Sequence, residues 1–144
     1  MGDVQTRNRA LGTWGLRMMI GLLSFQLAMF KLFIDGLEWN MQWFEKLRVW
    51  FPDWVLRATN IYAAVFELVG GALLILGLKR DWGLYMILSV LVVVTFGHGM
   101  EAAGWDIQQA VFRMAMVVAL LLLPAEWDVL RLDTLLARNT GNKG

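Results

Sequence analysis

The sequence predicts an all-α membrane protein, a bundle of four transmembrane helices formed by a single domain over residues 1–144. Hydrophobic residues make up 58% of the chain and charged residues only 17%, which is too apolar for an ordinary soluble domain. The apolar residues gather in four segments, 14–33, 57–78, 82–100 and 107–124. Each comes close to the roughly 20 residues that a helix needs to cross a bilayer.

The first segment, 14–33, places small and charged residues on one helical face. Steps of three and four residues align side chains along a helix, and small side chains let a neighbouring helix approach closely. We interpret Gly21, Ser24 and Ala28 as packing positions. Charged residues near the two ends, Arg17 and Lys31, can also extend towards the membrane interface. The full face comprises Arg17, Gly21, Ser24, Ala28, Lys31 and Asp35.

Residues 34–56 are predicted to lie in the headgroup region between the first two spans. Indole is apolar in its body and polar at its N–H group, which suits the membrane interface. We therefore expect one or two interfacial helices, broken near Pro52. The tryptophans that alternate with charged residues here are Trp39, Trp43, Trp50 and Trp54.

The second segment, 57–78, carries a single carboxylate, Glu67, near the bilayer midplane. An ionised carboxylate at that depth costs several kcal/mol, so Glu67 must be paired, hydrogen-bonded or protonated. Gly70 and Gly71 follow one helical turn later, and we interpret them as packing positions like those of the first segment.

The third and fourth segments, 82–100 and 107–124, supply further polar groups. His98 lies late in the third segment. Arg113 lies about 9 Å from the outer boundary of the membrane, measured along the fourth segment. Glu67 lies about 15 Å from the same boundary, and an extended arginine side chain can cover the difference. We predict Arg113 as the first partner of Glu67, followed by Lys31 and His98. These four residues would form a polar pocket in the outer half of the bundle, or else a buried ion pair that only fixes helix register.

The residues after Pro124 are amphipathic and too charged to span a membrane, so they predict a C-terminal surface helix. Lysine and arginine collect on the cytoplasmic side of membrane proteins. Only three of them, Lys46, Arg48 and Arg57, would lie on one side of the membrane, against eight on the side of the termini. This asymmetry predicts that both termini are cytoplasmic. The eight on the side of the termini are Arg7, Arg9, Arg17, Lys79, Arg80, Arg131, Arg138 and Lys143.

Composition also excludes several kinds of chemistry. The chain has no cysteine and one histidine, so we predict no metal site, no iron–sulfur cluster and no thiol catalysis. A formal net charge of only +1 gives no electrostatic footprint for nucleic acid. Without a nucleotide-binding glycine motif either, the chain has no intrinsic cofactor site, and we do not expect it to be an enzyme on its own.

Several motifs together identify a family resemblance. The run from Glu67 through Gly70-Gly71 to Gly77-Leu78 resembles the E-x-x-G-G-x-x-x-x-x-G-L signature of the DoxX-like family of small four-helix membrane proteins. Arg17, Gly21 and Lys31 resemble its first-span pattern, and His98 resembles a histidine late in its third span. The resemblance covers most of residues 16–124. The chain departs from the family at Leu27 and Ala28, where His-Gly is common, and at residues 124–127, which replace a glycine-rich turn.

The resemblance implies two functions. In the first, the chain is a membrane subunit linked to a quinone or respiratory redox system, for example as a subunit of an oxidoreductase, with a quinone or a lipid bound in the outer pocket. In the second, it is a non-catalytic accessory or assembly protein of a larger membrane complex. Either function implies contact with the lipid bilayer and with a membrane protein complex or further copies of the chain. We expect a multi-pass protein of the bacterial inner membrane.

Overall fold

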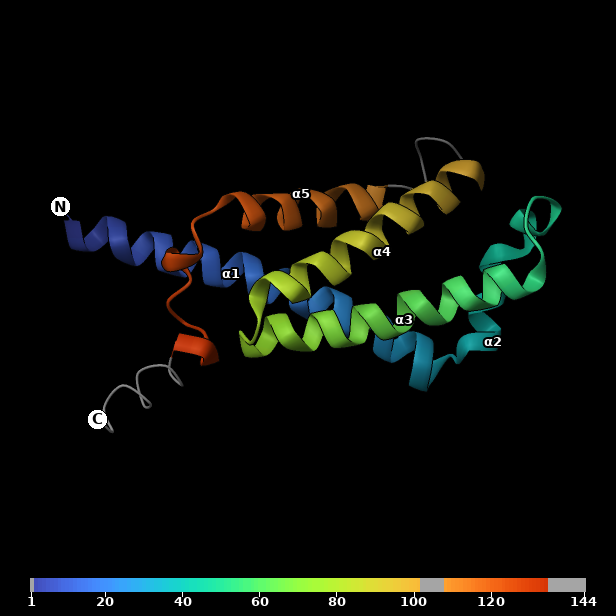
Figure 1. The fold of residues 1–144 in the computed structure, drawn as a ribbon, viewed down its shortest axis with the longest axis horizontal. Helices are drawn as coiled ribbons and strands as arrows, with labels where there is room; N and C mark the ends of the chain where they lie inside the picture. Colours follow the sequence, from blue (N-terminus) through green and yellow to red (C-terminus); the bar gives the residue numbers. More distant parts are fainter. Residues whose placement is uncertain (1, 102–107, 135–144) are drawn as a thin grey trace.

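The structure, a computed structural model, describes residues 2–101 and 108–134, and these residues are almost entirely helical. The chain runs through a long first helix, a short helical hairpin, two further long helices and a shorter fifth one (Figure 1). The elements are α1 (Gly2–Met29), the π-helix η1 (Phe30–Ile34), α2 (Leu37–Asn40), the 3-10 helix η2 (Met41–Val49), α3 (Asp53–Leu76), α4 (Arg80–Glu101), α5 (Gln108–Leu122) and the 3-10 turn η3 (Ala125–Trp127).

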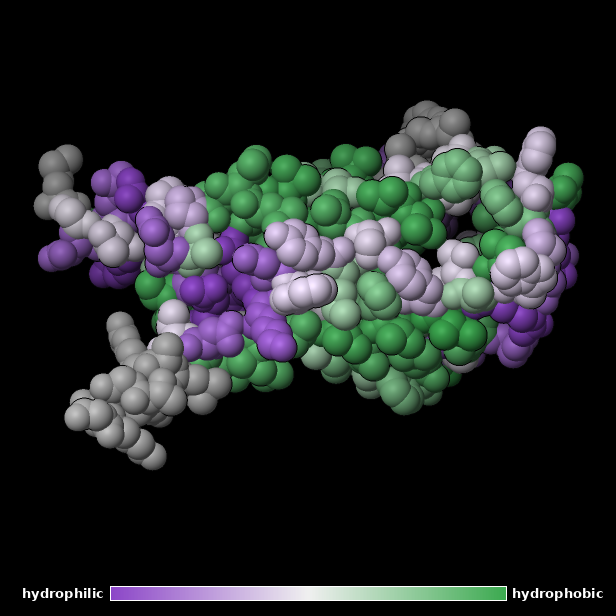
Figure 2. Space-filling view, in the orientation of Figure 1, coloured by the Kyte–Doolittle hydropathy of each residue, from purple (hydrophilic) through white to green (hydrophobic). Residues whose placement is uncertain are grey.

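Three helices are long and apolar enough to cross a membrane: α1 together with η1, α3, and α4. The apolar helix α5 is shorter, at 15 described residues, or about 22 Å at 1.5 Å per residue. Figure 2 shows hydrophobic side chains over the middle of the molecule and hydrophilic ones towards its two ends. This distribution is that of a membrane-embedded bundle.

The helices differ from the predicted spans mainly at their beginnings. α1 starts at Gly2 and continues through η1 to Ile34, so it extends well before the predicted span 14–33. α3 begins at Asp53, four residues before the span 57–78. Pro52 precedes it with an extended backbone and ends the hairpin formed by α2 and η2, because proline cannot continue a helix from the preceding turn.

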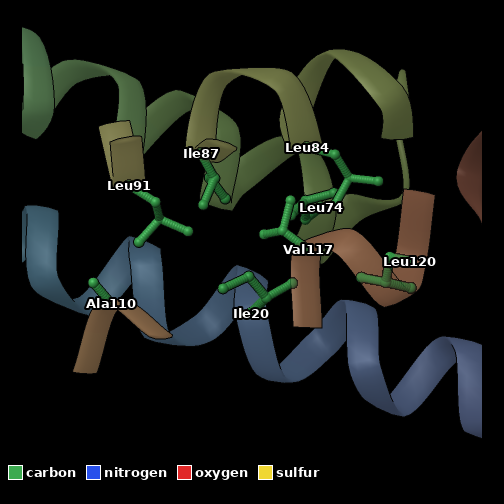
Figure 3. Packing of buried hydrophobic residues seen from close by; sticks show 8 residues of the cluster. All are labelled: Ile20, Leu74, Leu84, Ile87, Leu91, Ala110, Val117 and Leu120. Carbon is green, nitrogen blue, oxygen red and sulfur yellow. The ribbon is translucent and has the colours of Figure 1, made fainter. Parts of the chain in front are cut away.

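The core lies between α3 and its neighbours, with α1 and α4 packed against α3, and α5 against α4 and α1. Leucine, isoleucine and valine side chains from all four helices meet there (Figure 3). Glycines allow the closest contacts. A Cβ atom on Gly71 would lie 2.7 Å from the Phe25 nitrogen, and one on Gly70 would lie 3.1 Å from the Gly83 oxygen. Ser24 and Ala28 are fully buried on the same face of α1.

At the end of the bundle where α1 begins and η3 lies, one buried carboxylate binds two arginines. We call these three residues, Arg17, Arg80 and Asp128, the terminal clasp. Asp128 is fully buried; its Oδ2 lies 3.0 Å from Arg17 Nε and 3.8 Å from Arg80 Nε. The arginines also donate to carbonyls in the last turns of α3 and α5, Arg17 to Leu74 and Arg80 to Leu120. Carbonyls in the last turn of a helix lack the usual amide partner four residues further on. The clasp helps to satisfy both helix ends, together with the Gly77 nitrogen, which donates to the Leu74 carbonyl at 3.2 Å.

The terminal clasp explains why the predicted C-terminal surface helix is wrong over residues 125–131. These residues form the short turn η3 and then a non-helical stretch. Asp128 turns inward to the two arginines, and Arg17 Nη2 donates 2.6 Å to the Leu130 carbonyl. In both interactions, groups of residues 128–130 bond inward to arginines, so these residues do not form a helix on the surface. Residues 132–134 are helical, and the rest of the predicted helix, from residue 135 on, lies outside the described residues.

Replacing Asp128 with asparagine should destabilise the protein strongly. The substitution preserves shape but leaves two buried guanidinium groups without a counter-charge, which costs about 3–5 kcal/mol. Thermal unfolding in detergent should show a large fall in Tm. The matched control is Glu45→Gln, because Glu45 forms an ion pair with Arg48 while 65% of its side chain is exposed. Equal Tm values for the two variants would contradict a stabilising clasp.

Candidate functional site

Glu67 lies at the centre of a buried ion triad near the opposite end of the bundle. Its side chain is 1% exposed, and each carboxylate oxygen contacts a different cation. Lys31 Nζ lies 2.6 Å from Oε2, and Arg113 Nη1 lies 3.0 Å from Oε1. We call Lys31, Glu67 and Arg113 the ion triad. It joins η1, α3 and α5, so three segments far apart in sequence are held by one carboxylate.

Local backbone geometry positions the two cations. Lys31 lies in the π-helix η1, where the Asp35 nitrogen bonds the Phe30 carbonyl at 2.9 Å. A π-turn inserts an extra residue into a helix and shifts its side-chain register, and such turns recur at functional sites. Arg113 is held from its own helix, because its Nε donates to the Gln109 carbonyl at 3.3 Å.

A cavity of about 460 Å³ opens beside the ion triad. This volume falls within the range of small-molecule sites in proteins, which is roughly 300–1,000 Å³. The walls are mostly apolar and come from every helix of the bundle and from the hairpin. Figure 2 shows a hollow on this face between the late part of α4 and the early part of α3. The apolar lining includes Leu27, Phe44, Leu47, Ala63, Val94 and Ala110.

His98 and two asparagines are among the other polar groups of the cavity wall. The Nδ1 atom of His98 is buried and has no hydrogen-bond partner among the described residues. A buried polar atom without a partner is costly, so a ligand that bonds to it would be stabilised. Asn60 Nδ2 donates to the Leu37 carbonyl at 3.0 Å, and Asn40 Nδ2 lies 3.4 Å from Asn60 Oδ1. These bonds tie α2 to α3 beside the cavity.

The structure brings together all four residues predicted for the polar pocket. Arg113 and Lys31 both contact Glu67, whereas His98 lines the cavity and forms no hydrogen bond to the triad within the described residues. Sequence reasoning missed the contribution of the hairpin, which it placed only in the headgroup region. Met41 and Leu47 of η2 are buried in a small cluster with Leu56 at the start of α3, and Leu47 also lines the cavity. The apolar Phe44 and Leu47, three residues apart between charges, were the available signal.

Sequence reasoning also missed the terminal clasp. It treated Arg17 as an interfacial residue and placed Asp128 on a surface helix, whereas both are buried. A second contact supports the same region: the Lys79 nitrogen donates to Asp133 Oδ2 at 2.8 Å. The clasp is a structural element, since within the described residues its hydrogen bonds run to helix ends and within the clasp, and none of its three residues lines the cavity.

Comparison with known proteins gives one family. The family model described as DoxX matches residues 12–100, which include α3, α4 and most of α1. Lys31, Glu67 and His98 lie inside this range, and Arg113 lies outside it. No curated protein and no solved structure matches the chain.

The ion triad predicts strong coupling between Glu67 and Arg113. Glu67→Gln should leave two cations without a carboxylate, and Arg113→Gln should remove one partner, so each single variant should lower Tm in detergent. Their effects should not add, because both remove the same contact; coupling energies between such neighbours are about 0.5–3 kcal/mol. If the double variant loses the sum of the two single shifts, the side chains do not interact.

Proposed function

Because the chain belongs to the DoxX family, we propose that it is a small membrane subunit that binds a quinone-like ligand in the cavity beside the ion triad. The observation that carries this proposal is an apolar cavity of about 460 Å³ with polar groups at a few points of its wall. Ligand sites commonly combine apolar walls with a few such groups, which fix the orientation of the ligand.

The polar groups fit the two oxygens of a quinone. Lys31 and Arg113 offer N–H donors on one side of the cavity, and His98 offers a ring nitrogen from α4. A quinone, when bound, supplies the capacity to accept and release electrons and protons, which this cysteine-free chain lacks. The role of the chain's own residues is to bind the ring, orient its oxygens and exclude water. His98 and Glu67 are the groups able to hold a proton there.

A second candidate is a non-catalytic accessory protein of a larger membrane complex. It is favoured by the observation that both carboxylate oxygens of Glu67 are already occupied by cations. A triad that only fixes helix packing would have this geometry. In that case Glu67→Gln would lower the abundance of the assembled complex, while the intrinsic turnover of the assembled partner would stay unchanged.

We also propose four spans, with α5 as the fourth, in a bacterial inner membrane with both termini cytoplasmic. Basic residues support this orientation. Lys79, Arg80 and Arg131 lie at the end where α1 begins, while Lys46 and Arg48 lie on the hairpin at the opposite end (Figure 1). The positive-inside rule then places the clasp end in the cytoplasm and the cavity in the outer half of the membrane.

Filling the cavity should remove the ligand. Gly97 lines the cavity, and a Cβ atom there would meet only Leu47 Cδ1 at 3.7 Å, so Gly97→Leu extends a side chain into the space. Gly99→Leu is the matched control, because the same helix carries it and a Cβ atom on Gly99 would meet nothing within 4 Å. Quinone extracted from protein purified in mild detergent should fall about tenfold in the Gly97 variant, a loss of about 1.4 kcal/mol.

The same measurement decides the proposal. If the unmodified protein carries no quinone above the detergent background, or if the two glycine variants carry equal amounts, the cavity is not a quinone site. Both variants should retain the Tm of the unmodified protein to within a few degrees, since neither replaces a packed side chain.

The proposed topology predicts which single cysteines can be labelled in intact cells. The chain contains no cysteine, so one introduced on the hairpin at Gln42 and one at Asn8 report on opposite ends. A membrane-impermeant maleimide should label Gln42→Cys in intact cells and Asn8→Cys only after the membrane is opened. The reverse pattern would place the cavity on the cytoplasmic side, and labelling of both would exclude an odd number of spans between them.

A further inference from the structure

The ion triad carries one unbalanced positive charge. It contains two cations, Lys31 and Arg113, and one carboxylate, Glu67, whose side chain is 1% exposed. The cations are also largely removed from solvent, with 21% of the Lys31 side chain and 10% of the Arg113 side chain exposed. In surroundings of low dielectric constant an uncompensated charge attracts an opposite charge far more strongly than it does in water.

The two cations also have donors to spare on the cavity side. A guanidinium carries five N–H donors and an ammonium three. Arg113 uses Nη1 for Glu67 and Nε for Gln109, and Lys31 Nζ contacts Glu67; within residues 2–101 and 108–134 no hydrogen bond of Arg113 Nη2 is formed. Both residues line the cavity. The cavity wall therefore carries charged groups with donors that a ligand can use.

The other titratable groups on the cavity wall are His98 and Glu101. His98 is neutral or positive, so it does not compensate the triad. Glu101 is the last residue of α4, one helical turn beyond His98, and it forms no ion pair among the described residues. Glu101 is only partly buried, so solvent reaches it and screens its charge. An anion bound against Lys31 and Arg113 would be repelled only weakly by it.

We infer that the cavity selects the anionic form of its ligand, a quinone-like ring with one ionised oxygen, over the neutral form. The inference rests on the proposed quinone-binding function and specifies its ligand. The ionised oxygen lies against Lys31 and Arg113 and neutralises the triad, while the ring and tail lie against the apolar wall. Charge-assisted hydrogen bonds are roughly twice as strong as neutral ones, which adds to the preference.

A pair of matched probes tests this selectivity. One is a 2-hydroxy-3-alkyl-1,4-naphthoquinone, which is an anion at neutral pH; the other is the 2-methyl compound with the same alkyl chain, which is neutral. Binding is measured to the full chain in nanodiscs of zwitterionic lipid, with empty nanodiscs as the control for partitioning. We expect the anionic probe to bind about tenfold more tightly at equal concentration in the membrane.

Two variants assign the preference to the triad. Arg113→Gln and Lys31→Gln each leave a neutral pair around Glu67, so either should reduce the preference for the anion to about twofold or less. Lys31 is the more exposed of the two cations, so its variant keeps the test available if Arg113→Gln fails to fold. Glu101→Gln, which removes the remaining carboxylate of the wall, should leave the preference intact or increase it.

The outcomes separate this inference from the proposed function. If neither probe binds above the empty nanodiscs, the proposed function itself fails. If both bind equally well, the cavity is a quinone site but does not select charge, and the inference is overturned. A preference that persists unchanged in both Gln variants would also overturn it, because the selectivity would then come from groups other than the triad.

Discussion

The burial of Glu67 is the constraint on which the rest of the bundle depends. A carboxylate that is 1% exposed between apolar helices must be neutralised, and the structure does this with cations from two other segments. Lys31 reaches it because η1 departs from α-helical geometry, and Arg113 reaches it because α5 packs against α4 and α1. The helix arrangement at this end and the neutralisation of Glu67 therefore depend on each other. The cavity lies beside the same residues.

Both ends of the bundle neutralise a buried carboxylate with two cations, but the surroundings of the cations differ. At each end a buried carboxylate lies between two cations. In the terminal clasp, Arg17 and Arg80 use further donors to bond carbonyls in the last turns of α3 and α5, so these donors are occupied within the fold. In the ion triad, Lys31 and Arg113 face a cavity instead. The difference in what lies opposite the cations distinguishes a structural cluster from a candidate binding site.

The helices and the residues around Glu67 were predictable because membrane insertion imposes strong local rules. Long apolar runs become helices, and an intramembrane carboxylate needs a cation within reach, which left Arg113 and Lys31 as candidates. Asp128 was misplaced because its local pattern is amphipathic, whereas its position is decided by Arg17, 111 residues earlier in the chain. The hairpin was assigned to the interface from its tryptophans, and the spacing of Phe44 and Leu47 indicates an apolar face without showing that Leu47 reaches a cavity wall. Neither contact leaves a periodic signal in the sequence.

The position of Asp128 also bears on the order in which the bundle assembles during synthesis. Arg17 and Arg80 leave the ribosome long before the carboxylate that neutralises them, which follows the last apolar helix. Until that point Arg80, in the first turn of α4, lacks its counter-charge, whereas Arg17 can already donate to the Leu74 carbonyl in the last turn of α3. The terminal clasp can therefore be completed only after α5 has been synthesised, whereas all three residues of the ion triad precede Asp128 in the chain.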